Sequence, residues 1–286
     1  MKLCFMTARR DPPVPSQIVL DASEILSRRG HQVRSEIAEE TLTQIDSLKT
    51  DGSLYLLKSY TELSLSLAGV LHAQGARVLN PYPSCVACRN KIISLQYLRA
   101  GGIPVPRSWI TADMSLLIPL VKKMPLIVKP WMGWRGIGIK VVRTPEEVKA
   151  LPVPEAPLIV QEFLEGTGED LRLYVAGEKV FATRKPFSAS SFSIPGRSCT
   201  VTPAERELAL RCGRAFGLGL YGLDLIETPT GASVVDVNYF PGYKGTPNAA
   251  EAVADYIENY AAGKVSLELP APGSASLPSL AAGDAG

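Results

Sequence analysis

Residues 221–243 read Tyr221-Gly-Leu-Asp-Leu-Ile-Glu-Thr-Pro-Thr-Gly-Ala-Ser-Val-Val-Asp-Val-Asn-Tyr-Phe-Pro-Gly-Tyr243, and this stretch has the pattern of a β-hairpin. Two alternating runs flank Thr228–Gly231, and a three-residue loop, residues 229–231, with glycine at positive φ is a common connection. In that register Asp224 lies directly opposite Asp236, with Asn238 on the same face. A four-residue loop would move Asp224 off this pair.

Two carboxylates that face each other across a β-ladder repel and should destabilise it, so something must offset the repulsion between Asp224 and Asp236. Asn238 adds an oxygen donor, and an oxygen cluster with two negative charges suits a hard dication, above all Mg²⁺. The alternative is a solvated hairpin whose charges face water. The hairpin by itself leaves both interpretations open.

Length and charge narrow the class of protein. The chain has 286 residues, 46% of them hydrophobic, which suffices for one large core or for two to three subdomains. Lys and Arg total 30 against 28 Asp and Glu, which argues against a general surface for nucleic acid or for anionic membranes. No apolar run approaches the roughly 20 residues of a membrane span. Five scattered cysteines favour reduced thiols and a cytoplasmic protein.

Strand and helix patterns alternate through residues 1–80, which predicts an open, parallel α/β unit. A single helix is expected over Cys85–Ala100. A second hairpin is expected around the turn Ala176–Lys179. If that loop has two residues, Arg172 and Arg184 point to opposite faces, and one extra loop residue reunites them.

A glycine-rich stretch, Gly133-Trp-Arg-Gly-Ile-Gly138, lies between two predicted strands rather than between a strand and a helix. That context excludes a Walker loop and favours a hairpin flap that covers phosphates, with Lys129 at the end of the first strand as a phosphate partner. A plain glycine turn is the alternative. No histidine follows residue 72, which argues against a Ser/His/Asp or Cys/His triad in the C-terminal two-thirds.

The order of the motifs resembles that of the ATP-grasp superfamily, over about residues 2–262. The motifs, in order, are Asn90-Lys91 before Gly-Ile-Pro-Val-Pro106, Ile127-Val-Lys-Pro130 with the flap, Gln161-Glu-Phe-Leu-Glu-Gly166, Asp170-Leu-Arg172, Gly222-Leu-Asp224 and Asp236-Val-Asn-Tyr-Phe-Pro-Gly242. The pattern is most similar to the ribosomal-protein glutamate ligases among the carboxylate–amine ligases. The last motif is also similar to inositol trisphosphate kinases, which share the fold.

The resemblance implies an α/β protein with the ATP-grasp fold, α+β in the nucleotide site. An N-terminal open parallel α/β domain would precede two α+β subdomains that clasp ATP. The expected divisions are residues 1–84, a central lid subdomain over 85–165, a C-terminal subdomain with the metal site over 166–264, and a disordered tail over 265–286, where Ala, Pro, Gly and Ser dominate.

The resemblance also implies roles for individual residues. Lys91 and Lys129 would contact ATP phosphates, and Arg172 and Arg184 would hold phosphate or the acyl phosphate as catalytic residues. Mg²⁺, with Mn²⁺ as an alternative, would be bound by Asp224, Asp236 and Asn238. The remaining ATP-binding set is Arg135, Gly136 and Gly138 in the flap, Gln161, Glu162, Phe163 and Leu164 at the adenine, and Glu165 or Asp170 near the ribose.

Two departures from the family pattern affect these roles. Many members carry Glu where Asp236 stands, and Trp134-Arg135 replaces small flap residues, so that Arg135 would touch phosphates or the flap would serve another substrate. We also expect the facing Asp224 and Asp236 to be tolerated only because Mg²⁺–ATP neutralises them. Asp236→Asn should then leave the ligand-free protein equally stable or slightly more stable.

The function implied is an ATP- and Mg²⁺-dependent ligase that joins a carboxylate to an amine through an acyl phosphate, releasing ADP and phosphate. A kinase that phosphorylates a hydroxyl of a small molecule, such as an inositol phosphate, is the alternative. A nucleotide-binding protein without turnover is a third interpretation, which the intact Lys and Asp/Asn set argues against. The expected partners are small-molecule or peptide substrates, with no nucleic acid or membrane, and a homodimer is left open.

Overall fold

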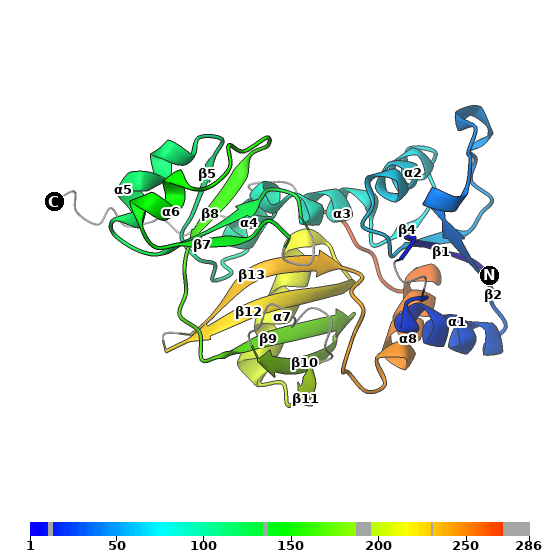
Figure 1. The fold of residues 1–286 in the computed structure, drawn as a ribbon. Coiled ribbons are helices and arrows are strands. Elements are labelled where there is room, and N and C mark those ends of the chain that lie inside the picture. The colour runs from blue at the N-terminus through cyan, green and yellow to red at the C-terminus, as the bar shows by residue number, and fades with distance from the viewer. Residues whose placement is uncertain (11–13, 134–136, 187–195, 230, 271–286) are drawn as a thin grey trace.

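The computed structural model describes residues 1–10, 14–133, 137–186, 196–229 and 231–270, and within these ranges the strands form three sheets (Figure 1). The N-terminal sheet is parallel, in the order β2-β1-β3-β4. Its strands are β1 (Lys2–Thr7), β2 (Gln32–Ile37), β3 (Leu54–Leu57) and β4 (Val78–Leu79). The expected open, parallel α/β unit is therefore confirmed.

Helices cover both faces of this parallel sheet. The helix α1 (Gln17–Arg28) and the helix α2 (Glu62–Ala73) lie on opposite sides of it (Figure 1). Right-handed crossovers explain this, because the chain moves from β1 outward to β2 but from β3 outward to β4 in the other direction. Two short 3₁₀ turns, η1 (Ala38–Glu40) and η2 (Ile45–Ser47), follow β2.

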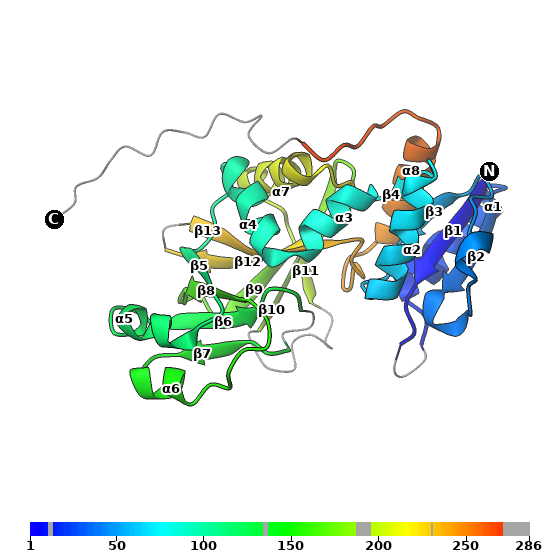
Figure 2. The ribbon, with the colours of Figure 1, turned by 90° about the horizontal axis from the view of Figure 1, so that it is seen from above.

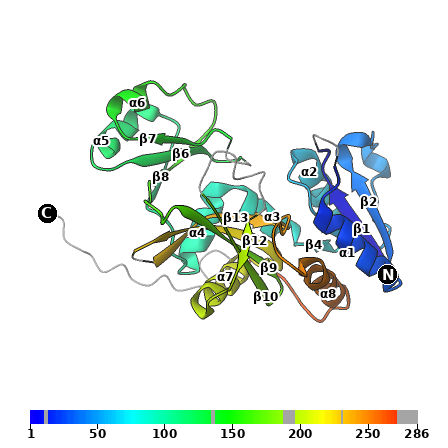
Figure 3. The same ribbon diagram turned by 60° about the horizontal axis from the view of Figure 1, so that its bottom comes forward.

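The second sheet belongs to a smaller unit, the lid, which Figure 3 shows apart from the N-terminal sheet. Its antiparallel strands run in the order β5-β8-β6-β7. The lid contains β5 (Ser108–Thr111), η3 (Met114–Leu117), α5 (Ile118–Val121), β6 (Leu126–Pro130), β7 (Lys140–Val142), α6 (Pro145–Lys149) and β8 (Leu158–Glu162). A separate hydrophobic cluster, with Leu126 and Val160 fully buried, holds this unit together.

The third sheet is antiparallel, in the order β11-β10-β9-β12-β13. Its strands are β9 (Glu169–Ala176), β10 (Lys179–Pro186), β11 (Arg197–Cys199), β12 (Leu220–Thr228) and β13 (Gly231–Tyr239). The helix α7 (Pro203–Phe216) lies behind this sheet (Figure 1). It begins at a capping box, in which Thr202 and Glu205 exchange hydrogen bonds, and it ends at Gly217 with φ +62°.

The predicted helix over residues 85–100 is two helices, α3 (Tyr82–Arg89) and α4 (Lys91–Ala100). Asn90 causes the break, because its backbone is extended and its side chain caps α4 by accepting from the N–H groups of Ile92 and Ile93. Both helices contribute to the larger hydrophobic core, which also includes the N-terminal and C-terminal sheets. The two hydrophobic cores therefore group α3 and α4 with the N-terminal and C-terminal sheets rather than with the lid, whereas residues 85–165 were expected to form one unit.

The C-terminal segment returns to the N-terminal sheet. The helix α8 (Ala249–Ala261) packs against α1, and Arg29 lies 3.0 Å from Asp255 and 2.6 Å from Glu258. Beyond α8, Val265, Leu267 and Leu269 are partly buried against the large core, so the segment expected to be disordered from residue 265 is packed up to Pro270 (Figure 2). Residues 271–286 of the expected disordered tail lie outside the described residues.

Asn80 ties the N-terminal part of the chain to β12. Its fully buried amide nitrogen donates to the Leu220 carbonyl at 2.7 Å. Its oxygen accepts from the N–H groups of Gly219 and Leu220 at 2.8 and 3.0 Å. A buried side chain that satisfies three backbone groups is costly to remove. The N–H groups of Gly219 and Leu220 would lose their acceptor, while the Leu220 carbonyl would keep only the hydrogen bond from the Phe240 N–H.

We expect Asn80→Ala to lower the free energy of unfolding by about 3 kcal/mol, because two buried backbone N–H groups lose their acceptor and the Leu220 carbonyl loses one of its two donors. Urea unfolding measures this loss. Asn259→Ala, on the partly buried side of α8, is the control and should be close to neutral, because alanine is the better helix former. Equal losses in the two variants would contradict the role given to Asn80.

Candidate active site

The C-terminal sheet separates charge from apolar packing by strand alternation. On β9, Leu171, Leu173 and Val175 are fully buried in the core, while Asp170 and Arg172 point to the opposite face. Because the neighbouring strands are in register, side chains on that face form rows across the sheet. One row runs through Thr183, Arg172, Asp224 and Asp236.

The facing pair Asp224 and Asp236 is confirmed, although the connection differs from the expected one. Thr228 pairs with Gly231, so the connection is one residue shorter than the three-residue loop that was expected. A β-bulge compensates, because Asp224 pairs with Asp236 while Leu225 pairs with Val234, which leaves Val235 as the extra residue. The bulge exposes the Val235 carbonyl, which accepts a 3.2 Å hydrogen bond from Lys129 Nζ.

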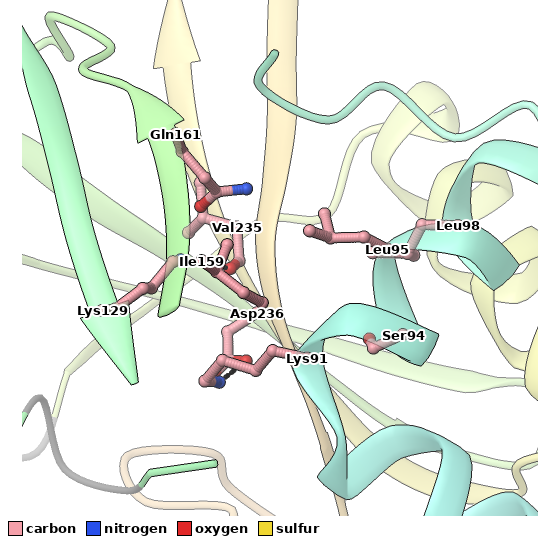
Figure 4. A pocket seen from close by; sticks show the side chains of 9 residues that line it. All are labelled: Lys91, Ser94, Leu95, Leu98, Lys129, Ile159, Gln161, Val235 and Asp236. Atoms are coloured by element: carbon pink, nitrogen blue, oxygen red, sulfur yellow. Dashed lines mark hydrogen bonds and ion pairs between the residues drawn. The ribbon is translucent and has the colours of Figure 1, made fainter. Parts of the chain in front are cut away.

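Two lysines from other parts of the chain point toward Asp236 (Figure 4). Lys91 is the first residue of α4, where the Asn90 cap starts the helix, and its Nζ forms an ion pair with Asp236 Oδ1. Lys129 comes from β6 of the lid and is only 7% exposed. Burial lowers the pKa of Lys129 to about 8, with Asp236 opposing that shift and Lys91 adding to it.

Cations of the protein therefore neutralise the two carboxylates. Burial would raise the pKa of Asp236, but the attraction of Lys91 and then Lys129 outweighs it, so that the pKa lies below its ordinary value. Asp224 lies 3.0 Å from Arg172 Nε, yet burial still raises its pKa. The expectation that only Mg²⁺–ATP offsets the repulsion is therefore wrong, because Lys91, Lys129 and Arg172 already do so.

The oxygen donors on this face fit a magnesium ion. Asn238 lies two residues beyond Asp236 on β13, and its side chain forms a hydrogen bond with the Asp236 carboxylate. Within the described ranges no group of three or more His, Cys, Asp or Glu could hold a metal. Two carboxylates and an amide oxygen are instead a hard, oxygen-only set, which Mg²⁺ prefers and which leaves positions for phosphate oxygens or water.

A pocket lies beside these charges, between the lid, α4 and β13 (Figure 4). Its lining residues are Lys91, Ser94, Leu95, Leu98, Lys129, Ile159, Gln161, Val235 and Asp236. The α4 residues Ser94, Leu95 and Leu98 were missed from the sequence. Their spacing from Lys91 places them on one helix face, which was the available signal.

The expected adenine segment lies at the rim of this pocket. Gln161 is 1% exposed, and its amide donates to Ser108 Oγ at 2.9 Å. The side chain of Glu162 is held by Arg107, with Nε 2.6 Å from Oε2, and the Phe163 N–H donates to the Pro125 carbonyl. Among the described residues the Leu164 N–H has no acceptor, so it is available to a ligand.

The structure does not bring every expected residue to the cleft. The β9–β10 pairing leaves Gly177-Glu178 as a two-residue loop, so Arg184 lies opposite Leu171 on the apolar face. There its Nη2 donates to Glu227 at 2.9 Å, which corrects the expected catalytic role. Lys185 takes the charged face instead, opposite Asp170.

The other expected ligands lie at the edges of the cleft. Glu165 is exposed after the end of β8. The flap joins β6 to β7, which are antiparallel neighbours, as expected for a glycine-rich link between two strands. Gly138 adopts φ +78°, and a Cβ there would approach Pro130 Cγ to 2.8 Å. Arg135 and Gly136 lie outside the described residues.

Comparison with known proteins gives a consistent match. The model of the RimK-like ATP-grasp domain matches residues 88–257, more than half of the chain. A probable alpha-L-glutamate ligase of Chromohalobacter salexigens is 33% identical over 204 residues, which is 64% of this chain and 68% of that protein.

Solved structures show the same fold. A RimK domain protein ATP-grasp from Sphaerobacter thermophilus aligns with a TM-score of 0.71 at 19% identity, over 90% of this chain and 99% of that one. The ATP-grasp ligase PsnB, complexed with a phosphomimetic variant of its minimal precursor, Mg and ADP, aligns with a TM-score of 0.65 at 19% identity, over 91% and 99% of the two chains.

The electrostatics predict opposite effects for the two aspartates in the ligand-free protein. The depressed pKa of Asp236 means that its charge stabilises the fold above the ordinary aspartate pKa and that this contribution is lost as pH falls. At pH 7 we therefore expect Asp236→Asn to lower the free energy of unfolding by about 1–3 kcal/mol. The raised pKa of Asp224 makes Asp224→Asn neutral or stabilising.

Chemical unfolding at pH 7 and at about pH 3 measures both effects. The Asp236→Asn deficit should shrink at the lower pH, because the stabilisation from a carboxylate with a depressed pKa is progressively lost once the pH falls below the ordinary aspartate pKa. A deficit of the same size at both pH values would show that lost packing, rather than lost charge, causes it.

Proposed function

The chain belongs to the family of RimK-like ATP-grasp proteins and is an ATP-dependent carboxylate–amine ligase, and on that premise we propose that the pocket between the lid, α4 and β13 binds its ATP. The observation that carries this proposal is the convergence of Lys91 from α4 and Lys129 from β6 on Asp236 of β13. Three distant segments supply the charges that a magnesium–triphosphate group needs.

We assign the parts of ATP to parts of this pocket. Lys91 and Lys129 would pair with phosphate oxygens, and Asp224, Asp236 and Asn238 would hold Mg²⁺. The apolar side chains of Leu95, Leu98 and Ile159 would contact the adenine, with the Leu164 N–H as its hydrogen-bond donor. When bound, Mg²⁺–ATP supplies the phosphoryl group that activates the substrate carboxylate.

Arg172 is the residue we propose for the reacting carboxylate. It lies in the charged row beside Asp224, and Lys185 flanks it on β10. A guanidinium in this position can hold a carboxylate or its phosphorylated form by paired hydrogen bonds. The lid would cover these groups and exclude water from a reactive acyl phosphate.

For the substrates we propose an amino acid as the amine, with L-glutamate as the first candidate because the curated relative is named for glutamate. The acid would come from a small molecule or a peptide. The family match and this relative favour a ligase over the kinase that the sequence left as an alternative. A homodimer stays a prediction.

The cysteines and helices bear on the compartment. All five cysteines are unpaired, four of them buried, which supports the reducing cytoplasm that we propose. None of the helices in the described part of the chain has the length and apolar character of a membrane span.

The reaction class predicts its own products. With ATP, Mg²⁺ and a carboxylate substrate, the enzyme should release ADP, and hydroxylamine in place of the amine should trap the acyl phosphate as a hydroxamate. A panel of amino acids and dicarboxylates, assayed for ADP and hydroxamate, tests this. A phosphorylated alcohol without hydroxamate would establish the kinase instead.

Lys129 predicts the pH dependence of ATP affinity. Because its pKa is lowered to about 8, the side chain loses its proton above that pH in the free enzyme and must regain it to pair with phosphate. The affinity for Mg²⁺–ATP should therefore fall from about pH 8 to about pH 9, by up to about tenfold, with proton uptake on binding. Calorimetry in buffers of different ionisation enthalpy measures both quantities.

Lys129→Met is the matched variant for this experiment. It should bind Mg²⁺–ATP about 10–100-fold more weakly at pH 7 and show no proton uptake above pH 8, because the titrating group is gone. An unchanged pH profile in the variant would assign the titration to another group.

A further inference from the structure

A group of cations outside the ATP pocket lies where the N-terminal sheet meets the loop after β13. Lys58 directly follows β3, and Arg10 follows β1 by three residues, so both stand at the carboxyl edge of a parallel sheet. Ligands of open α/β sheets bind at that edge. Lys244 comes to the same place from the loop that joins β13 to α8.

The position of Lys58 is fixed by contacts on both sides. The N–H groups of Lys58 and Ser59 both donate to the Met6 carbonyl at 2.9 Å, and the Tyr239 hydroxyl donates to the Ser59 carbonyl at 2.8 Å. The ammonium of Lys58 lies 5.6 Å from the ring centroid of Tyr60 and 5.7 Å from that of Phe240. The position of the Lys58 ammonium is therefore fixed by backbone hydrogen bonds and by two aromatic rings.

The loop that carries Lys244 is also fixed, in an unfavourable backbone conformation. Phe240 and Tyr243 have φ of 36° and 49°, values that side chains other than glycine rarely adopt. Packing holds them there, because the Phe240 N–H donates to the Leu220 carbonyl at 2.7 Å and the Tyr243 hydroxyl donates to the Val175 carbonyl at 2.5 Å. Such strain is concentrated at ligand-binding segments.

Among the described residues, the charges that act on the Lys58 ammonium are positive. Burial, followed by the charges of Arg10 and Lys244, lowers the pKa of Lys58 to about 8. Within the described ranges, which omit 11–13 and 187–195, no carboxylate contacts the Lys58 ammonium. Like charges that a fold holds together are stabilised when an anion binds among them.

This group is connected to the reaction centre by further cations. Lys185 lies beside Arg172, opposite Asp170, and Lys244 is among the charges that lower its pKa after burial and Arg172. Lys244 is thus near both Lys185 and Lys58. A substrate held at Arg172 could therefore extend an anionic group toward Lys58.

We propose that Lys58, Arg10 and Lys244 form a subsite for a substrate carboxylate that does not react. The proposal rests on the ligase function, because it needs a second carboxylate beside the reacting one. That carboxylate is either the α-carboxylate of an amino acid that acts as the amine or the second carboxylate of a diacid. The enzyme would accordingly select dicarboxylates or amino acids over their uncharged counterparts.

Binding can be measured without turnover, by calorimetry on the full chain saturated with Mg²⁺–ADP. L-glutamate and its analogue 4-aminobutyrate, which lacks the α-carboxylate, probe the amine substrate. Glutarate and its monoamide probe the acid substrate. Lys58→Met should weaken binding of L-glutamate or of glutarate by about 10–100-fold, and should leave binding of the matched analogue unchanged.

Two control variants separate lost charge from lost structure. Lys58→Arg keeps the charge and should retain most of the affinity, and Lys264→Met, an exposed lysine after α8, should change nothing. All variants should bind Mg²⁺–ADP as the wild type does, which shows an intact fold and nucleotide pocket. Equal binding of both probes by Lys58→Met and wild type would overturn the subsite, as would the absence of binding of either probe to the wild type.

The ligase function fails separately. If no hydroxamate forms with any acid while Lys58→Met still loses carboxylate binding, the subsite stands and the reaction is different. If hydroxamate forms but Lys58→Met binds L-glutamate and glutarate as tightly as the wild type does, the ligase stands and the subsite is refuted.

Discussion

Two carboxylates that face each other across a β-ladder are the constraint on which the rest of the site depends. Asp224 and Asp236 occupy neighbouring strands of one sheet, where side chains lie close enough to repel. Three cations from different parts of the fold offset this repulsion. Arg172 reaches from the adjacent strand, Lys91 from a helix start and Lys129 from the lid. The ligand-free protein is therefore balanced, and a bound metal would exchange partners with lysines that are already in place.

The same arrangement explains why the lid can be a separate body. The hydrophobic cluster of the lid is confined to its own strands and helices. The rest of the protein, here called the base, contacts the lid at this point through a polar interaction, from Lys129 Nζ to the Val235 carbonyl. Opening such a contact exposes a lysine and a carbonyl to water and leaves the apolar core intact. The base, in contrast, is one continuous core that joins the N-terminal and C-terminal sheets.

Much of this could be predicted from the sequence where a local pattern decides the structure. The parallel unit, the capping box at Thr202 and the facing aspartates all follow from periodicity and turn chemistry. The errors arise where one residue changes a register or a boundary. The β-bulge at Val235 restored a pairing that the shorter loop alone would have shifted. Asn90 divided one predicted helix into two. The two-residue turn at Gly177 placed Arg184 on the apolar face of the sheet, away from the charged cleft. The grouping of Lys58 with Lys244 depends on tertiary packing, which no local pattern encodes.

The two cores differ in how far apart their parts lie along the chain. The lid is built from residues that are close in sequence, so it can fold as soon as that stretch has left the ribosome. The large core includes Leu3 and packs against Leu269, and α8 closes over α1. The base is therefore completed only after α8 and the segment up to Leu269 have been synthesised. Until then the nascent chain contains a folded lid and an incomplete base, in which α1 still lacks its contact with α8.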